Sequence, residues 1–303
     1  MPDGALIELV KGVFGLQESP RLWWLKLRDA VLEAGFEEIP GVPGVFALFD
    51  KLRKLVGLLC VHVDDGTWGG IVPCIKKALD ILRRLLTIKV ERTGTFDILG
   101  RRVTHKPDMI TVSQHEYVAA VKPIPVSAER KRNATASLTD SERTQYLSLT
   151  QQLSWPARTT MPGLCFAVSS LQQRTPLATV ADLSKANWEL RNAQTMSRSG
   201  AELRFKRDPA FDLKDLMVIG AHDASFGQQT GQGSQQGSVV MIAGNSKALT
   251  EKIEAQVCVL DWSSSKIHRI VRSTLAAEAA SASTTHDRAT LIRHTLAWLV
   301  TPH

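Results

Sequence analysis

The segment Lys54–Gly70, KLVGLLCVHVDDGTWGG, organises the prediction for the whole chain. Apolar residues follow one another almost without a break from Leu55 to Val63, which is typical of a strand buried on at least one face. The run stops at Asp64, Asp65 and Gly66, where the Asp-Gly pair predicts a tight hairpin turn. We therefore expect two adjacent carboxylates at the tip of a hairpin.

The paired carboxylates have two interpretations. An Asp-Gly turn commonly carries solvated acids that have no chemical role. Adjacent carboxylates can instead share Mg²⁺ ions, which stabilise the attacking and leaving oxygens in phosphoryl transfer. The turn by itself leaves both interpretations open, and the segments around it bear on the choice.

Distinctive segments lie on both sides of the hairpin. Upstream, residues 9–36 read LVKGVFGLQESPRLWWLKLRDAVLEAGF. Downstream come FDILGRRV, ITVSQHEYV, YLSLTQQLSWPARTTMPGLCFAV, HDASFG and LDWSSSKIHRIVRSTLAAEAAS. In this order and spacing, and together with VHVDDG, they resemble the reverse transcriptase and ribonuclease H domains of Ty1/copia-type retrotransposon Pol polyproteins. The resemblance covers most of the 303 residues.

The resemblance implies an α+β fold: a partial polymerase palm with a helical thumb and connection, followed by a partial ribonuclease H-like α/β domain. The expected domains are residues 1–122 for the palm, 123–200 for a linker with the thumb and connection, and 201–303 for the ribonuclease H-like domain. The linker is expected over residues 123–137, which lack apolar periodicity and are rich in Pro, Ser and charge.

The resemblance also implies roles for particular residues. Asp64 and Asp65 are expected to bind catalytic Mg²⁺ (or Mn²⁺) in an RNA-directed DNA polymerase, and Asp223 and Glu278 to bind the metal ions of a ribonuclease H site. The loop before the first helix is expected near the incoming deoxynucleotide and the template, with Gly15, Gln17, Ser19 and Arg21 as substrate-binding residues. The expected partners are an RNA/DNA hybrid, a primer–template, deoxynucleotides and other parts of the polyprotein.

Composition sets broader limits. The length of 303 residues allows two modest domains, and 44% apolar with 22% charged residues is ordinary for a globular protein. No apolar run is long enough to span a membrane and no signal peptide is recognisable, so the expected location is intracellular, in the cytoplasm or the nucleus. The four cysteines show no CxxC pairing and are expected as reduced thiols. A net charge of +7 favours a polyanionic partner, although each basic pair can equally be a solvated face.

Local patterns predict the individual elements. Ser19 and Pro20 predict the N-cap and first turn of a helix that Gly35 closes, with Trp23 in the core. A second amphipathic helix is expected around Ile75–Leu86, and helices are expected over about 141–158, 162–173, 180–197 and from Ser273, with Trp155 and Trp188 as core anchors. Strands are expected at 87–92, 96–104, 109–113, 203–206, 216–221, 238–243 and 256–260, with a flexible Gly/Gln/Ser-rich loop at 227–238 and a turn at WSSSK.

Compared with the family that it resembles, the chain is expected to be incomplete. A third palm carboxylate would come from a strand well upstream of the loop that begins at Gly12, and further ribonuclease H carboxylates would follow the helix that ends near Leu299. The alternative to an enzyme is therefore a catalytically inactive nucleic-acid-binding remnant of a retrotransposon polyprotein. Metal binding that depends on Asp64 would distinguish the two.

Overall fold

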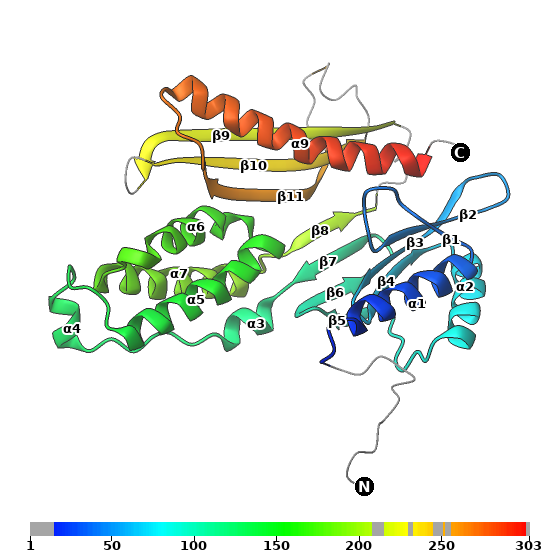
Figure 1. The fold of residues 1–303 in the computed structure, drawn as a ribbon, viewed down its shortest axis with the longest axis horizontal. Helices are drawn as coiled ribbons and strands as arrows, with labels where there is room; N and C mark the ends of the chain where they lie inside the picture. Colours follow the sequence, from blue (N-terminus) through cyan, green and yellow to red (C-terminus); the bar gives the residue numbers. More distant parts are fainter. Residues whose placement is uncertain (1–14, 208–214, 230–232, 245–250, 252–255, 301–303) are drawn as a thin grey trace, which may run out of the picture. The chain divides into compact units, whose positions relative to one another are not determined.

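The computed structural model describes residues 15–207, 215–229, 233–244, 251 and 256–300 (Figure 1). By the contacts within it, the chain divides into two compact units. Unit 1 comprises Met1–Glu91 and His294–His303, and unit 2 comprises Arg92–Arg293. The three domains expected from the sequence have other boundaries and stay a prediction. Every strand pair described is antiparallel, and helices accompany each unit, so the protein is a mixed α+β structure.

Unit 1 is built on a four-stranded sheet of order β1-β2-β3-β4. The strands are β1 (Phe36–Glu38), β2 (Val45–Phe49), β3 (Leu55–His62) and β4 (Asp65–Gly70). The expected apolar strand is confirmed as β3, which lies between β2 and β4 in the sheet. One glycine in β3 and one in β4 permit close packing: a Cβ on Gly57 would lie 2.4 Å from Ile75 Cδ1, and Gly57 is paired with Gly70 across the sheet.

Two helices cover one face of this sheet: α1 (Ser19–Glu33) and α2 (Val72–Leu85). Their apolar residues pack against Phe46 and Leu59 in one hydrophobic core, and burying each large apolar side chain there contributes about 1.5–3 kcal/mol. The opposite face carries a smaller core of Ile39 and Ala47 with Leu299, from the last turns of α9 (Thr274–Val300).

Two predictions for unit 1 were wrong in detail. Ser19 is the first residue of α1 and not its cap; the cap position is Glu18, whose side chain makes no capping hydrogen bond, and Pro20 favours the helical start through its fixed φ. Gly35 ends the helix as expected, with φ of +91°. Residues 87–92, expected as a strand, form no strand because they pair with no neighbouring strand.

Unit 2 begins with a second four-stranded sheet of order β5-β6-β7-β8. Its strands are β5 (Thr95–Ile98), β6 (Arg101–His105), β7 (Met109–Ser113) and β8 (Leu203–Lys206). Residues 96–104, expected as one strand, are instead a hairpin, because Leu99 and Gly100 both have positive φ and form a two-residue turn. The strands at 109–113 and 203–206 are confirmed.

The helices of unit 2 are α3 (His115–Ala120), α4 (Ala128–Arg132), α5 (Asp140–Thr159), α6 (Cys165–Arg174) and α7 (Val180–Arg198), with short 3-10 turns at Pro162–Leu164 and Thr175–Leu177. The three long helices are confirmed. Their core consists of aliphatic residues around the fully buried Tyr146. Trp155 and Trp188, expected as core anchors, are 38% and 54% exposed, because both lie on the outer faces of their helices.

The prediction of a linker at residues 123–137 is wrong. The segment contains α4, and its residue Ile124 is buried. The backbone N–H and C=O of Ile124 each make a hydrogen bond of 2.8 Å to the side chain of Asn187. A segment without apolar periodicity can still be fixed in place when a buried amide satisfies its backbone groups.

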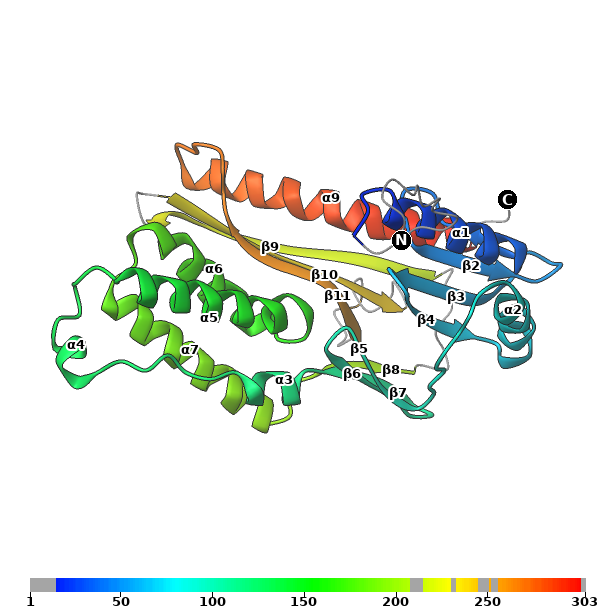
Figure 2. The same ribbon diagram turned by 60° about the horizontal axis from the view of Figure 1, so that its bottom comes forward.

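A three-stranded sheet of order β11-β10-β9 completes unit 2. Its strands are β9 (Leu216–Gln229), β10 (Gly233–Gly244) and β11 (Val257–Lys266), all longer than expected. Helix α6 packs on one face and α9 on the other (Figures 1 and 2). The WSSSK turn was a wrong prediction, and so was the flexible loop over residues 227–229 and 233–238, because these residues belong to strands in which Gln and Ser side chains bond across the sheet, as Gln235 does with Ser264 at 2.8 Å. The remaining loop residues, 230–232, lie outside the described part of the chain.

Among the described residues, no helix has both the length and the apolar character needed to span a bilayer. The four cysteines, all within the described residues, are free thiols.

Candidate active site: the paired-carboxylate hairpin and the β9–α9 acids

The two carboxylates of the hairpin lie at its tip. His62 pairs with Asp65 across β3 and β4, so the turn consists of Val63 and Asp64, and Asp65 is the first residue of β4. The expected Asp-Gly turn is thus displaced: Gly66 lies in β4, opposite Val61. Asp64 and Asp65 are both exposed, and their oxygens are accessible to ions and ligands.

The turn is strained at Val63. This residue has φ of +56°, a region that costs a β-branched side chain about 1–3 kcal/mol. Its side chain is 66% exposed, so burial does not offset the strain. Positive φ at the first central residue alone is the pattern of a type II′ hairpin turn, for which glycine is the usual choice. Backbone strain of this kind concentrates at functional sites.

Trp23 holds the strained turn from outside the hairpin. Its indole Nε1 donates a hydrogen bond of 2.7 Å to the carbonyl oxygen of Val63, 40 residues away in the chain. The sequence placed Trp23 in the core, which is wrong: the residue is 37% exposed, whereas the adjacent Trp24 faces inward, with its ring 6.2 Å from that of Phe46. Consecutive helical residues point about 100° apart, so only one of the two indoles could face the core.

The expected substrate-binding residues lie at the start of the helix that carries Trp23. Gly15 has φ of +95°, and Gly15, Gln17 and Arg21 are exposed while Ser19 is half-buried. Ser19 N–H donates to the Leu16 carbonyl at 3.2 Å, which shapes the loop that enters α1. Trp23 is thus the link between this helix start and the carboxylate turn.

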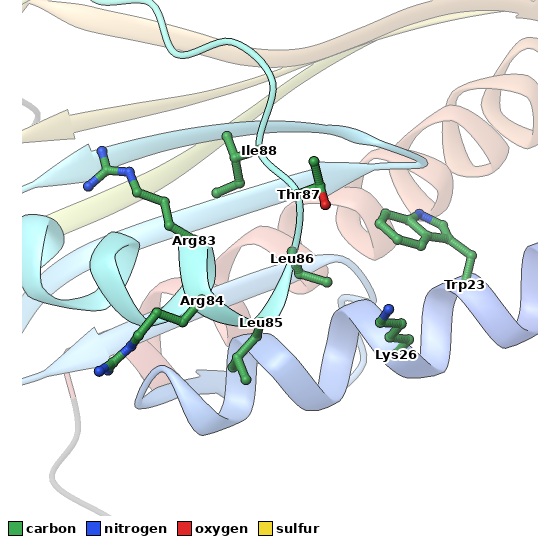
Figure 3. Close-up of a pocket in the computed structure, with 8 residues that line it drawn as sticks. All are labelled: Trp23, Lys26, Arg83, Arg84, Leu85, Leu86, Thr87 and Ile88. Carbon is green, nitrogen blue, oxygen red and sulfur yellow. The ribbon is translucent and has the colours of Figure 1, made fainter.

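A shallow hollow of about 460 Å³ lies beside Trp23 in unit 1 (Figure 3). Trp23 and Lys26 extend from α1 toward the segment that follows α2, where Leu86, Thr87 and Ile88 complete the lining with residues 83–85. Arg83 is engaged with Asp80 and with Glu91, and its hydrogen bond to Glu91 lowers the pKa of that carboxyl. The sequence showed Arg83 and Arg84 as a basic pair but carried no signal that Trp23 would lie beside them.

Asp64 and Asp65 provide only some of the oxygen ligands that Mg²⁺ needs. Two adjacent carboxylates can bind an ion that keeps several waters and takes its remaining oxygens from phosphates. Among the residues that the structure describes, no group of three or more His, Cys, Asp or Glu side chains is placed to hold a metal ion. Asp64 and Asp65 therefore provide two ligands of such a site.

The backbone beside Asp223 lies close to Glu278, but the carboxylates of this second expected pair do not converge. The Glu278 carboxylate accepts a hydrogen bond from Ala224 N–H at 3.3 Å and lies 3.6 Å from His222 Nδ1. Strand residues alternate between faces. His222 pairs with Ser238, whose hydroxyl accepts a hydrogen bond from Arg288 of α9, so His222 lies on the α9 face and the side chain of Asp223 lies on the other face. Asp223 lies within β9 and not, as expected, at its end.

Two known plant proteins are similar to the chain in sequence. It is 24% identical over 291 residues to the retrovirus-related Pol polyprotein from transposon RE1 of Arabidopsis thaliana, an alignment that covers 92% of this chain and 18% of that protein. It is 27% identical over 177 residues to the corresponding polyprotein from transposon RE2 of the same plant, covering 54% of this chain and 12% of that protein. No family model matches the chain, and no solved structure matches it. The chain spans less than a fifth of either relative, and what it is similar to in sequence is the retrovirus-related Pol polyproteins of these two plant transposons.

Proposed function

We propose that this chain is the reverse transcriptase and ribonuclease H-type region of a retrotransposon polyprotein, and that Asp64 and Asp65 bind Mg²⁺ or Mn²⁺ for RNA-directed DNA synthesis. The observation that carries the proposal is the hairpin turn itself. It presents two exposed carboxylates on a strained Val63 backbone, and a hydrogen bond from Trp23 secures that turn. Arg53 and Leu99 also have positive φ, and of these three residues the β-branched Val63 bears the largest steric cost.

In this proposal the metal ions would neutralise charge on the reacting phosphates. The protein would position the metal ions and the deoxynucleotide. Asp64 and Asp65 would hold the ions, Trp23 would keep the turn in one conformation, and the start of α1 with Gly15, Gln17, Ser19 and Arg21 would approach the deoxynucleotide. The primer–template and an RNA/DNA hybrid would be held through phosphates by a chain whose net charge is +7.

A second candidate function applies to the region around β9 and α9. The geometry of Asp223 and Glu278 does not favour metal-dependent cleavage there, which leaves the non-catalytic alternative for this region. Glu278 is already engaged by Ala224 N–H and lies beside His222, and the Asp223 side chain lies on the opposite face of the sheet. Two carboxylates that do not converge cannot share a metal ion.

Primer extension tests the first proposal. The full chain and its Asp64→Asn/Asp65→Asn variant are each given a DNA primer on an RNA template with Mg²⁺ or Mn²⁺, and Mn²⁺ binding is measured in parallel by electron paramagnetic resonance. The control variant, Asp29→Asn/Glu33→Gln, removes two exposed acids of α1 in the same unit.

We expect extension and Mn²⁺ binding in the unmodified chain and in the control, and the loss of both in the hairpin variant. An enzyme that loses one of several catalytic residues acting together typically loses several orders of magnitude in rate. If all three proteins bind the hybrid equally and none extends the primer or binds Mn²⁺, the non-catalytic alternative replaces the polymerase.

A further inference from the structure

Some hydroxyl side chains of the chain follow an arginine by three residues. There are four of them, all threonines, and they end the segments RLLT (84–87), RTGT (92–95), RRVT (101–104) and RNAT (132–135). Protein kinases that select basic substrates pair their own carboxylates with a guanidinium at this spacing, because the planar fork of arginine matches a carboxylate. The sequence thus contains four candidate phosphate acceptors, and they differ in how the structure presents them.

Three of the four lie in or directly after packed elements. Thr95 and Thr104 lie opposite each other in the paired strands β5 and β6. Thr87 is exposed, but the arginine before it belongs to the last turn of α2, where Leu82 is buried in the core of unit 1. A kinase binds its acceptor segment as an extended chain, so at these positions it would have to separate two strands or unwind a packed helix.

Thr135 lies in an exposed turn directly after α4. This helix has five residues, none of them buried, and the Ser127 side chain caps it by accepting a hydrogen bond of 3.1 Å from Arg130 N–H. In both views α4 lies at one end of α5 and α7 (Figures 1 and 2). A short helix without buried side chains costs little to open, so the residues before Thr135 become extended without disturbing a core.

The arginine three residues before Thr135 is available to a kinase. Within the described part of the chain, neither Arg132 nor the adjacent Lys131 makes an ion pair. Arg130 is engaged instead: it donates to the Glu142 carboxylate at 2.8 and 2.9 Å. Recognition of this segment by charge therefore falls on Arg132.

The backbone around Thr135 is bound to the start of α7. Ala181 N–H donates to the Ala134 carbonyl at 2.8 Å, and Val180 N–H donates to the Ala136 carbonyl at 3.1 Å. Opening α4 does not require breaking either bond. The N-terminus of a helix favours negative charge, so a phosphate on Thr135 would be stabilised there after its transfer.

We propose that Thr135 is a phosphate acceptor for an arginine-directed protein kinase, with Arg132 as the residue that the kinase recognises. In this step Thr135 Oγ1 forms a bond to the γ-phosphorus of ATP, the bond from that phosphorus to the bridging oxygen breaks, and ADP leaves with the electron pair. The hydroxyl proton passes to the catalytic aspartate of the kinase. The modification adds a charge of about −1.5 to −2 to the chain. The inference goes beyond the proposed function, since it does not depend on polymerase activity.

The test incubates the full chain with radiolabelled ATP, Mg²⁺ and the catalytic domain of calmodulin-dependent protein kinase II, which selects an arginine three residues before its acceptor. Incorporated label gives the rate, and mass spectrometry of phosphopeptides locates the phosphate. Thr135→Val removes the hydroxyl, Thr135→Ser keeps it, and Thr87→Val is the control at another exposed candidate. Arg132→Gln and Lys131→Gln compare two neighbouring exposed cations of α4. Circular dichroism establishes that each variant is folded.

We expect phosphate on Thr135 in the unmodified chain, retained in Thr135→Ser and Thr87→Val and lost in Thr135→Val. Arg132→Gln should lower the rate about tenfold or more, because a charge-assisted hydrogen bond to the kinase is lost. Lys131→Gln should change the rate by less than about threefold, as is typical of an exposed charge without a defined partner.

Three results would overturn the inference: no phosphate on the unmodified chain, phosphate on another residue in place of Thr135, or equal effects of Arg132→Gln and Lys131→Gln. Because the measurement detects the phosphate itself, a negative result leaves the proposal for Asp64 and Asp65 untouched. A negative primer-extension result likewise leaves the proposal for Thr135 untouched.

Discussion

Trp23 Nε1 donates a hydrogen bond of 2.7 Å to the carbonyl oxygen of Val63, the residue that precedes the paired acids Asp64 and Asp65. The bond joins the second turn of α1 to the tip of the β3–β4 hairpin. It fixes a carbonyl in a turn whose backbone is strained, and so it limits the positions that the neighbouring carboxylate can take.

Replacing Trp23 with Phe should loosen the turn. The variant keeps an aromatic ring but lacks the indole N–H donor. We therefore expect a loss of about 0.5–1.5 kcal/mol in the free energy of unfolding and up to about tenfold weaker Mn²⁺ binding. Urea unfolding and electron paramagnetic resonance measure the two effects. Trp188→Phe, at another exposed indole, should change neither. Unchanged Mn²⁺ affinity in the Trp23 variant would show that the bond does not position the acids.

Replacing Val63 with Gly should relieve strain. Glycine adopts φ of +56° without steric cost, and this gain of about 1–3 kcal/mol exceeds the entropic cost of about 0.5–1 kcal/mol. We expect a more stable hairpin and a higher urea midpoint. The comparison is Val90→Gly, which is equally exposed but has no positive φ, and which should not be stabilised. Stabilisation of both variants to the same extent would contradict the assignment of strain to Val63.

Gly70 and Gly69 provide a matched pair at the end of β4. A Cβ on Gly70 would lie 2.3 Å from the Val56 carbonyl oxygen, and its φ is +153°, whereas a Cβ on Gly69 would meet nothing within 4 Å. Gly70→Ala should lower the free energy of unfolding by about 3 kcal/mol, and Gly69→Ala should change it by less than about 0.5 kcal/mol. Chemical denaturation of both variants measures the difference, and equal effects would show that the backbone at Gly70 relaxes freely.

Glu142 should make unit 2 sensitive to acid. The hydrogen bonds from Arg130, at 2.8 and 2.9 Å, and from the Thr139 backbone lower the pKa of this carboxyl to about 2, from an ordinary value of 4.5. A carboxyl whose pKa is lower in the folded than in the unfolded chain stabilises the folded state at pH values above its unfolded pKa. This contribution to stability is lost as the pH falls from about 4.5 to about 2.

Glu142→Gln isolates this contribution, because glutamine can keep the capping box at the start of α5 while losing the charge. The variant should be less stable near neutral pH by about 1 kcal/mol or less and should match the unmodified chain near pH 2. Thermal unfolding across pH measures this. Glu129→Gln, on α4, removes an exposed carboxylate of the same unit and is the matched control. A Glu142 variant that stays parallel to the unmodified chain at every pH would contradict the role of the carboxylate.

Several features could be predicted from local pattern alone. The apolar run of β3, the amphipathic spacing of α2 and the glycine that closes α1 all specify their structure within a few residues, because propensity and hydrophobic periodicity act over short distances. The order of the motifs also predicted the relationship to retrotransposon polyproteins, which the plant relatives support.

Other features depended on contacts between distant segments. The linker prediction failed because Asn187, 63 residues away, bonds the backbone of Ile124. Residues 227–229 and 233–238, expected in a loop, are strand because β9 and β11 pair with β10. Polar sequences carry little periodicity, so only the neighbour that satisfies their backbone groups decides their structure.

The sequence by itself determined that two carboxylates would lie at the tip of a hairpin. Only the tertiary structure decided that Val63 and Asp64 form the turn and that Trp23 lies outside the core and bonds to it. It also decided that the side chain of Asp223 lies on the face of the sheet opposite to α9, the helix that carries Glu278. Chain pattern specifies which residues share an element, but register, helix rotation and strand face follow from how elements pack, and a shift of one residue moves a side chain to the opposite face.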